Sequence, residues 1–368
     1  MEQPINLDPR GDVQRILLST TSRLLGAYET SDVRIDHAWP GPLADGAHHR
    51  WQEGATSRSA YVLSFIAPSW EQRAGVVMPE YSGAGDFAAS TLSVLFGKRV
   101  ESHGALENCG MFRMPDVGAF ATTCYPGLPH NTHAVRADIP IPLNLVEARR
   151  LTQLWSDDAV EDKAAFDGFT GAARFYQRAL VAADRDPEIA YLHLITAGEV
   201  LSEAWLPKDD DRLLDADLDR DLARVTAALA DGGALARQLR KRLFEVRRRY
   251  VTTFLDLVDA GFFERREASE PYSAFTSDKF GAAMGSAYDL RSYNLHRGEI
   301  VGHWMRSLHG NNEIQLGRPV VTDRDVANAL AAAPTLIGLE RVTRYALLKF
   351  AEKRLGFDLE VDALEVPT

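Results

Sequence analysis

The sequence is poor in cysteine and has no long apolar run. Cys109 and Cys124 are the only cysteines among 368 residues, which is too few for a disulfide framework, and they are not spaced as close metal ligands. No stretch is long enough to span a bilayer, and residues 1–4 lack the charged and then apolar pattern of a signal peptide. We therefore expect a cytoplasmic protein with reduced thiols and no membrane partner.

Two patterns that often mark a metal or a cofactor are incomplete here. His130 and His133 could contact one metal ion, but Pro129 disfavours a helical ligand pair and no third ligand is nearby. Residues 83–88 read Gly-Ala-Gly-Asp-Phe-Ala and match the Gly-x-Gly-x-x-Ala form of a dinucleotide-binding fingerprint. However, residues 79–82 separate them from the preceding strand-like run, and no series of alternating strands and helices surrounds them. We predict a strand-to-helix turn at the glycines and neither a metal nor a cofactor.

Positive charge is also scarce, because 41 lysines and arginines stand against 52 aspartates and glutamates and give a net charge of −11. This charge argues against broad, nonspecific affinity for nucleic acid. The distribution is uneven, since residues 237–250 carry seven basic residues and one acidic residue. If this segment is a helix, its leucines share one face and the candidate RNA-binding residues face outward: Arg237, Arg240, Lys241 and Arg248. An RNA-contacting face and a solvated face neutralised by the aspartates of residues 209–221 both remain open.

The length of the chain predicts two domains. Residues 1–142 combine a helix at 13–25 with short β-type runs between Pro/Gly-rich stretches, which indicates an α+β domain. Its further elements are expected to be strands at 33–39, 59–66 and 75–78, a helix at 86–96, and strands at 111–113, 119–124 and 134–141. Residues 143–161 are predicted to form a connecting helix. Residues 162–368 have helical apolar spacing and predict an all-α bundle, in which one helix continues from the aspartate-rich segment through the basic residues.

Residues 287–298 contain the most informative pair of side chains, Arg291 and His296. At about 100° per residue, five positions separate them by about 140°, so a straight helix does not direct both at one point. Gly298 predicts a C-terminal cap that places His296 in the last turn, where the helix dipole favours its protonated form. A histidine that titrates near neutral pH beside a permanently charged guanidinium suits phosphodiester chemistry. A solvated helix end is the alternative interpretation of the same pair.

This segment resembles the Arg-x4-His signature of the HEPN superfamily. Its surroundings resemble the ApeA-like HEPN branch, in which a Leu-Tyr-x-Leu-Arg-Ser run leads into the histidine. Residues 172–180 resemble the first helix of that branch and residues 192–201 the second, whose glutamate corresponds to Glu199. The resemblance covers about the C-terminal half of the chain. Ser292 follows the arginine where nuclease members more often carry Asn, Asp or His, and Arg297 stands where many relatives have glycine.

The resemblance implies a HEPN-like bundle at residues 162–368 that pairs into a homodimer across its motif helices. It also implies a metal-independent endoribonuclease, in anti-phage defence or a toxin-like role, that leaves 2′,3′-cyclic phosphate ends. The candidate catalytic residues are then Arg291, His296, Glu199 and Asn294. Glu199 would orient Arg291 or His296, and an exposed or salt-bridged Glu199 is the alternative. The rival function is a non-catalytic HEPN module that binds nucleic acid, a nucleotide or a protein partner, with residues 1–142 as its sensor.

Overall fold

The computed structural model describes residues 11–38, 59–70, 74–114, 124–155, 161–207, 210–213, 216–242, 246–298, 302–306 and 311–359. The chain divides into two compact units. The first, here called the sheet unit, comprises residues 1–159 and 358–368, and the second, the helical unit, comprises residues 160–357. The expected order of an α+β region followed by a largely helical region is confirmed.

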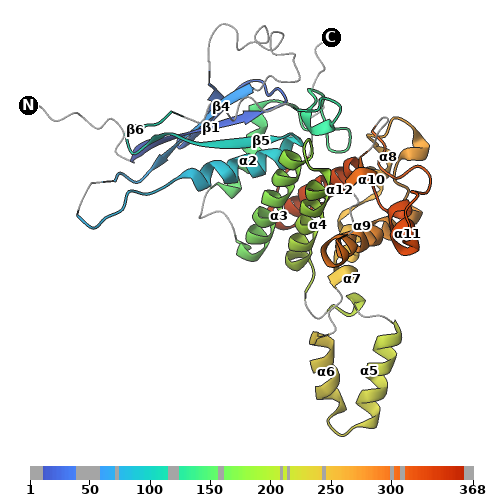
Figure 1. The fold of residues 1–368 in the computed structure, drawn as a ribbon. Helices are drawn as coiled ribbons and strands as arrows, with labels where there is room; N and C mark the ends of the chain where they lie inside the picture. The colour runs from blue at the N-terminus through green and yellow to red at the C-terminus, as the bar shows by residue number, and fades with distance from the viewer. Residues whose placement is uncertain are drawn as a thin grey trace, which may run out of the picture. The chain divides into compact units, whose positions relative to one another are not determined.

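The sheet unit is built on a six-stranded antiparallel sheet with the order β2-β3-β4-β1-β5-β6. The strands are β1 (Asp12–Thr20), β2 (Tyr28–Glu29), β3 (Val33–His37), β4 (Ser59–Ala67), β5 (Val100–Asn108) and β6 (Met111–Phe112). Helix α2 (Ser82–Phe96) packs against β1 and β5 (Figure 1). Two 3₁₀ segments, η2 (Pro129–Asn131) and η3 (Leu145–Leu154), follow along the chain.

Several elements of the sheet unit differ from the sequence prediction. The helix predicted at 13–25 is wrong, because residues 12–20 form strand β1 between β4 and β5. Consecutive side chains of β1 are buried, and such a continuous apolar run does not distinguish a buried strand from a buried helix. The strands predicted at 75–78 and 134–141 are irregular segments. Most of the strand predicted at 119–124 lies outside the described residues.

The glycine-rich fingerprint lies inside α2 and not in a turn before it. The helix begins at Ser82, so the predicted strand-to-helix turn at the glycines is wrong. Gly85 faces the sheet, where a Cβ atom would come within 2.5 Å of the Ser102 hydroxyl and 2.6 Å of Ile16 Cγ2. A side chain at this position would push α2 away from β1 and β5. The missing side chain of Gly85 therefore serves helix-to-sheet packing.

The helical unit has two long N-terminal helices, α3 and α4, that run side by side, and α12 packs against both (Figure 1). Asp162 and Asp186 cap α3 and α4 by accepting hydrogen bonds from the backbone N–H groups of Ala165 and Ile189. The described elements are α3 (Lys163–Ala182), α4 (Pro187–Trp205), η4 (Asp211–Leu213), α5 (Ala216–Ala228), α6 (Gly232–Arg242), α7 (Val246–Leu257), α8 (Ala260–Glu264), η5 (Pro271–Ser273), α9 (Ser277–Arg297), α10 (Gly302–Met305), α11 (Arg324–Ala332) and α12 (Leu336–Leu355).

A buried ion pair ties α12 to the loops around it. Arg341 Nη1 lies 2.8 Å from Glu313 Oε1, and both side chains are almost completely buried. The Arg341 guanidinium also lies over the ring of Phe262, with 3.8 Å from Cζ to the ring centroid. The Glu313 carboxylate accepts hydrogen bonds from the backbone N–H groups of Ala268 and Phe275. These partners offset the cost of burying two charges, so the pair fixes the core of the helical unit.

Helices α5 and α6 form an antiparallel hairpin between α4 and α7 in the chain (Figure 1). The single helix predicted from the aspartate-rich segment through the basic residues is therefore wrong. The turn at residues 229–231 leads into Gly232, whose Cβ would come within 2.3 Å of the Val225 carbonyl oxygen. Only a residue without a side chain permits this close return of the chain. The basic residues are consequently divided between α6 and α7.

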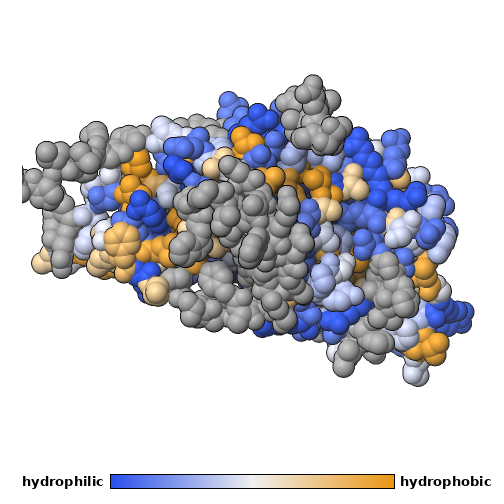
Figure 2. All heavy atoms as spheres, turned by 90° about the horizontal axis from the view of Figure 1, so that it is seen from above, coloured by the Kyte–Doolittle hydropathy of each residue, from blue (hydrophilic) through white to orange (hydrophobic). Residues whose placement is uncertain are grey.

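The surface carries apolar and polar residues side by side. Hydrophobic residues stand among hydrophilic ones on the face drawn in Figure 2. Among the described residues of the sheet unit, Val77, Phe112 and Met114 are the most exposed large apolar side chains. None of the helices in the described part of the chain combines the length and the apolar character that a membrane crossing requires.

Candidate functional site

The two motif residues lie on α9, the long helix that packs against α4, α7 and α11. Gly298 ends this helix in the left-handed conformation with φ 68°, and its N–H donates to the Asn294 carbonyl at 3.0 Å. The predicted C-terminal cap is therefore confirmed, and the backbone of His296 lies in the last turn of α9. The side chain of His296 lies outside the described residues.

Arg291 and Glu199 form an ion pair between α9 and α4. Arg291 Nη2 lies 2.9 Å from Glu199 Oε2, and the two side chains are 26% and 16% exposed. Burial raises the pKa of the Glu199 carboxyl above its ordinary value, while the Arg291 charge and the Tyr288 hydroxyl act in the opposite direction. Glu199 is thus salt-bridged and also directed at the candidate arginine, so the two interpretations of this residue do not exclude each other.

Aromatic rings surround this ion pair within the bundle. The Tyr288 ring lies beside Arg291, with 5.8 Å from the guanidinium carbon to the ring centroid. Tyr250 of α7 packs against Tyr288 at a centroid distance of 5.6 Å and is completely buried. Gly198 of α4 leaves room for the Tyr250 ring, because a Cβ atom at this position would come within 2.5 Å of the ring. The site is therefore half-buried, which strengthens its electrostatic interactions relative to those in water.

Asn294, the fourth candidate catalytic residue, lies one turn further along α9. Its Nδ2 donates a hydrogen bond of 2.5 Å to Glu188 Oε1 in the first turn of α4. Asn294 and Arg291 thus each contact a different glutamate of α4. The structure brings Arg291 and Glu199 together directly, and it places Asn294 at a second contact between the same two helices.

The basic residues have several different environments. Arg237 is exposed on α6, whereas Arg248 is only half-exposed on α7. The side chains of Arg240 and Lys241 lie outside the described residues. Arg247 forms a two-point ion pair with Asp289 of α9, at 2.8 and 3.0 Å. The segment 237–250 is therefore not one continuous basic face.

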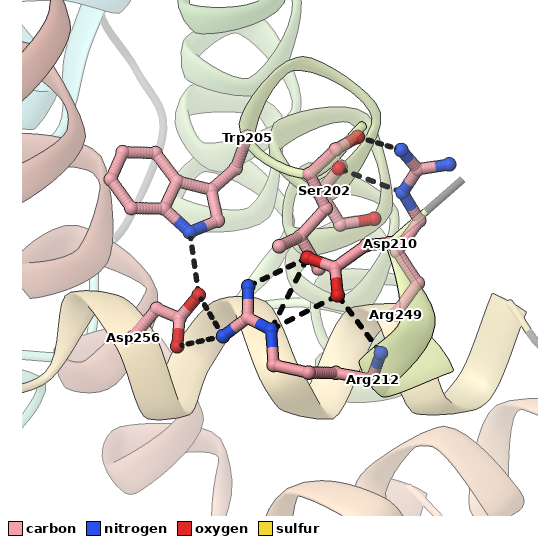
Figure 3. Close-up of polar contacts among 7 residues, drawn as sticks. Ser202, Trp205, Asp210, Arg212, Arg249 and Asp256 are labelled. Atoms are coloured by element: carbon pink, nitrogen blue, oxygen red, sulfur yellow. Dashed lines mark hydrogen bonds and ion pairs between the residues drawn. The ribbon is translucent and has the colours of Figure 1, made fainter. Parts of the chain in front are cut away.

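Arg249 belongs to the core, although the sequence places it in the middle of the basic segment. Its side chain is completely buried, and its guanidinium donates a hydrogen bond to the carbonyl oxygen of Ser202 (Figure 3) and another to that of Leu206. The bond from Nε to the Ser202 oxygen is 3.0 Å long. A third contact, of 3.2 Å, joins Nη1 to Glu203. Arg249 thereby gives the Leu206 carbonyl, just past the end of α4, a donor, and it adds a second donor to the Ser202 carbonyl, which also accepts the Leu206 N–H at 3.2 Å.

A second arginine connects the segment before the hairpin to α7. Arg212 contacts Asp210 at 2.7 Å and Asp256 at 2.9 Å, and Trp205 Nε1 donates to Asp256 at 3.1 Å (Figure 3). The two carboxylates raise the pKa of the Arg212 guanidinium above its ordinary value. Together with Arg249, these contacts join the end of α4, the segment η4 and α7.

Tyr288 belongs to the run that resembles Leu-Tyr-x-Leu-Arg-Ser, but the sequence indicated no role for its side chain, nor for that of Arg249. Tyr288 precedes Arg291 by three positions, a spacing that puts two side chains on the same face of a helix, so this signal was present. Burial of Arg249 depends on the packing of α7 against α4 and has no local signal. Among the described residues, no group of three or more His, Cys, Asp or Glu side chains could hold a metal ion.

Comparisons of the chain with protein-family models, with curated proteins and with solved structures find no match. The central contact is the ion pair between Arg291 and Glu199, which joins two segments that the sequence had marked independently.

Proposed function

We propose that the chain is a metal-independent endoribonuclease of HEPN type, with Arg291 and His296 as its reacting groups. The observation that carries the proposal is the 2.9 Å ion pair between Arg291 and Glu199. The resemblance selected these two residues from separate segments. If it were a chance match, nothing would require their side chains to be in contact. A half-buried arginine held by a carboxylate is also a prepared binding group for a phosphate.

In the proposed reaction, the ribose 2′-oxygen forms a bond to phosphorus and the bond from phosphorus to the 5′-oxygen breaks. The 2′-hydroxyl loses its proton to a base, and the departing 5′-oxygen receives a proton from an acid. His296 fills one of these roles in each copy of the chain. Arg291 stabilises the negative charge of the phosphorane-like transition state. RNA is required because DNA lacks the 2′-hydroxyl, and the products carry a 2′,3′-cyclic phosphate and a free 5′-hydroxyl.

A homodimer is part of this proposal. Arg291 and His296 are five residues apart on one helix, a spacing that directs them about 140° apart. Two copies related by a two-fold axis would bring both pairs to one site, so that one His296 acts as base and the other as acid. Glu199 holds Arg291 in place before the substrate arrives, which reduces the entropy lost on binding. A role in anti-phage defence or as a toxin-like enzyme rests on the resemblance alone.

A non-catalytic HEPN module is the second candidate function. The observation that favours it is the same ion pair, because Glu199 already offsets the positive charge of Arg291. The involvement of Arg247 and Arg249 in contacts with other helices also reduces the number of basic residues that RNA could reach. In this case the protein would bind nucleic acid, a nucleotide or a protein partner without cutting RNA.

The test compares RNA cleavage by the full chain with that of His296→Ala and Arg291→Ala. Loss of a general acid or base costs about 10²–10⁴-fold in rate, and loss of a charge-stabilising contact costs about 10²–10³-fold. Arg318→Ala is the control, because it removes an exposed arginine that bonds Asn328 elsewhere in the helical unit. Both motif variants should remain folded and keep, by sedimentation, the dimeric state of the wild type, although Arg291→Ala should lower the melting temperature because it leaves the half-buried Glu199 without its partner.

The nuclease proposal also predicts cleavage in the presence of EDTA. Cleavage that survives in both motif variants, that stops in EDTA, or that occurs in a protein shown to be monomeric at tens of micromolar would contradict it. If the wild type cuts no RNA but binds it in a manner that depends on Arg291, the binding module replaces the nuclease.

A further inference from the structure

Two arginines stand on the exposed side of α3. Arg174 and Arg178 are four residues apart, so their side chains lie on the same face of this helix, and both are exposed. Neither has an ion pair with another residue that the structure describes. On α5, by contrast, Arg220 and Arg224 have the same spacing and each contacts an aspartate of its own helix, at 3.0 and 3.1 Å. The charges of Arg174 and Arg178 can therefore act on a negatively charged ligand.

An aromatic pair beside these arginines joins α3 to α4, which run side by side (Figure 1). The Phe175 ring of α3 packs against the imidazole of His193 on α4 at a centroid distance of 5.8 Å, and both residues are partly exposed. The guanidinium carbon of Arg178 also lies 5.8 Å from the centroid of the Phe175 ring. Ile189, one turn before His193, is 43% exposed. We call Arg174, Phe175, Arg178, Ile189 and His193 the α3–α4 patch.

The chemistry of the α3–α4 patch suits an unpaired nucleic acid strand. Burial and the Arg178 charge lower the pKa of His193, so its ring is mostly neutral at pH 7 and offers a flat surface. Bases of a single strand stack on such rings, while arginines beside the rings contact the phosphates. A duplex keeps its bases in its own stack, and the acidic side chains of a protein have no flat face to place on the rings. The combination of rings and arginines therefore favours a single strand over both.

The α3–α4 patch lies on the same helix as the glutamate of the motif site. His193 and Glu199 are six residues apart on α4, which corresponds to about 9 Å along its axis. Thr196 lies between them and is partly exposed, as they are. Asp186 stands before the first residue of α4, at the end of the patch that is farther from Glu199. A strand on the patch would be repelled at that end and would run along α4 toward Arg291.

We propose that the α3–α4 patch binds single-stranded RNA, with bases stacked on the Phe175 and His193 rings and phosphates held by the two arginines. The choice of RNA rests on the proposed function, because an RNA strand held here would extend to Arg291. The patch includes none of the motif residues and none of the basic segment 237–250. It adds a substrate-binding surface outside the motif, and it defines the substrate as a strand with unpaired bases next to the cleaved bond.

The experiment measures binding to the full chain by fluorescence anisotropy. The probe is a labelled, short oligouridylate with 2′-O-methyl riboses, which lacks the nucleophile for cleavage, and the same strand annealed to oligoadenylate is the duplex for comparison. Phe175→Leu removes the ring and keeps an apolar side chain. It should weaken binding of the single strand about tenfold, the effect of losing one base stacked on an aromatic ring. Phe175→Tyr keeps the ring and should bind the probe as the wild type does.

The double variant Arg174→Gln/Arg178→Gln tests the phosphate contacts. The salt dependence of binding should become less steep by about 0.7 for each lost contact on a single strand, and hence by about 1.4 for both. Arg220→Gln/Arg224→Gln is the matched control, because it removes the same charge at the same spacing from α5, and it should leave affinity and slope unchanged. Both pairs of arginines are exposed, so these variants keep the inference testable even if Phe175→Leu does not fold.

Single-strand binding that stays unchanged in Phe175→Leu and in the α3 arginine variant would overturn the inference. An equal loss in the α5 control, an equal loss for the duplex, or a wild type that does not bind the probe in low salt would also overturn it. The probe reports binding without cleavage, so failure of the nuclease is recognised separately. A wild type that binds through the patch but cuts no RNA supports the patch and refutes the nuclease. If the wild type cuts RNA, the patch variants should raise KM and leave kcat unchanged.

Discussion

Replacing Arg249 by methionine should destabilise the helical unit, whereas the same change at Arg237 should have little effect. Both arginines belong to the basic segment and are indistinguishable by composition. Arg249 is completely buried and donates to two backbone carbonyls at the end of α4, while Arg237 is exposed on α6. Methionine retains much of the apolar stem and supplies no donor, so the substitution isolates the loss of the guanidinium.

The magnitude follows from the groups that lose their partner. A hydrogen bond from a charged donor contributes about 1.5–3 kcal/mol, and a buried carbonyl left without a donor costs an amount of the same order. The Leu206 carbonyl loses its guanidinium donor, whereas the Ser202 carbonyl loses one of two donors and keeps the Leu206 N–H at 3.2 Å. Glu203 is 53% exposed and regains water, so it adds little. The sum is about 3–5 kcal/mol, in the range seen when one partner of a buried charged contact is removed.

The assay is urea unfolding of the full chain, combined with hydrogen exchange of peptides that cover residues 196–207 and 246–257. Arg249→Met should lower the unfolding midpoint and speed exchange in both peptides, because α4 and α7 lose their shared contact. Arg237→Met should change the free energy of unfolding by less than about 0.5 kcal/mol. Equal destabilisation by the two variants would refute the assignment of Arg249 to the core.

Two further predictions concern charge. Arg237→Glu should weaken RNA binding and reduce its salt dependence by about one unit of slope, while Arg224→Glu on the opposite helix of the hairpin should not; equal effects would return α6 to a solvated face. Asp162→Ala should lower the free energy of unfolding at pH 7 by about 1 kcal/mol, because it removes the cap of α3. The hydrogen bond from the Ala165 backbone lowers the pKa of Asp162, so this stabilisation is present above the ordinary aspartate pKa and is lost as the pH falls through the lower folded value. Urea unfolding at pH 7 and pH 3 should show the difference shrink, and an equal difference at both would contradict the prediction.

The sequence was most informative where local signals and tertiary packing agree. The helices at residues 187–205 and 336–355 lie in the segment predicted to be an all-α bundle, and Gly298 ends α9 as its position predicts. Strand β5 was missed because it has polar residues at many positions and contains Gly104, whose φ of 87° accompanies an irregular register with β1. Such a bulge interrupts the alternation by which a strand is predicted.

The candidate site could be predicted only in part for a similar reason. The resemblance selected Arg291 and Glu199 separately, and packing of α9 on α4 was needed to bring them into contact. Arg248 was predicted to face outward, but it is half-buried on α7, because the basic segment spans two helices. Charge patterns indicate how many basic residues a segment carries, whereas burial is decided by neighbours far away in the sequence.

Gly198 has a consequence beyond packing. Its missing side chain lets the Tyr250 and Phe254 rings rest on the backbone of α4, one residue before Glu199. Even alanine there would displace the ring, hydrate Glu199 and weaken its hold on Arg291. If the chain is the nuclease proposed above, a screen for inactive variants would therefore recover substitutions at residue 198 together with those of the motif. Genetic loss of activity at such a position would report on the dielectric environment of the site and not on its chemistry.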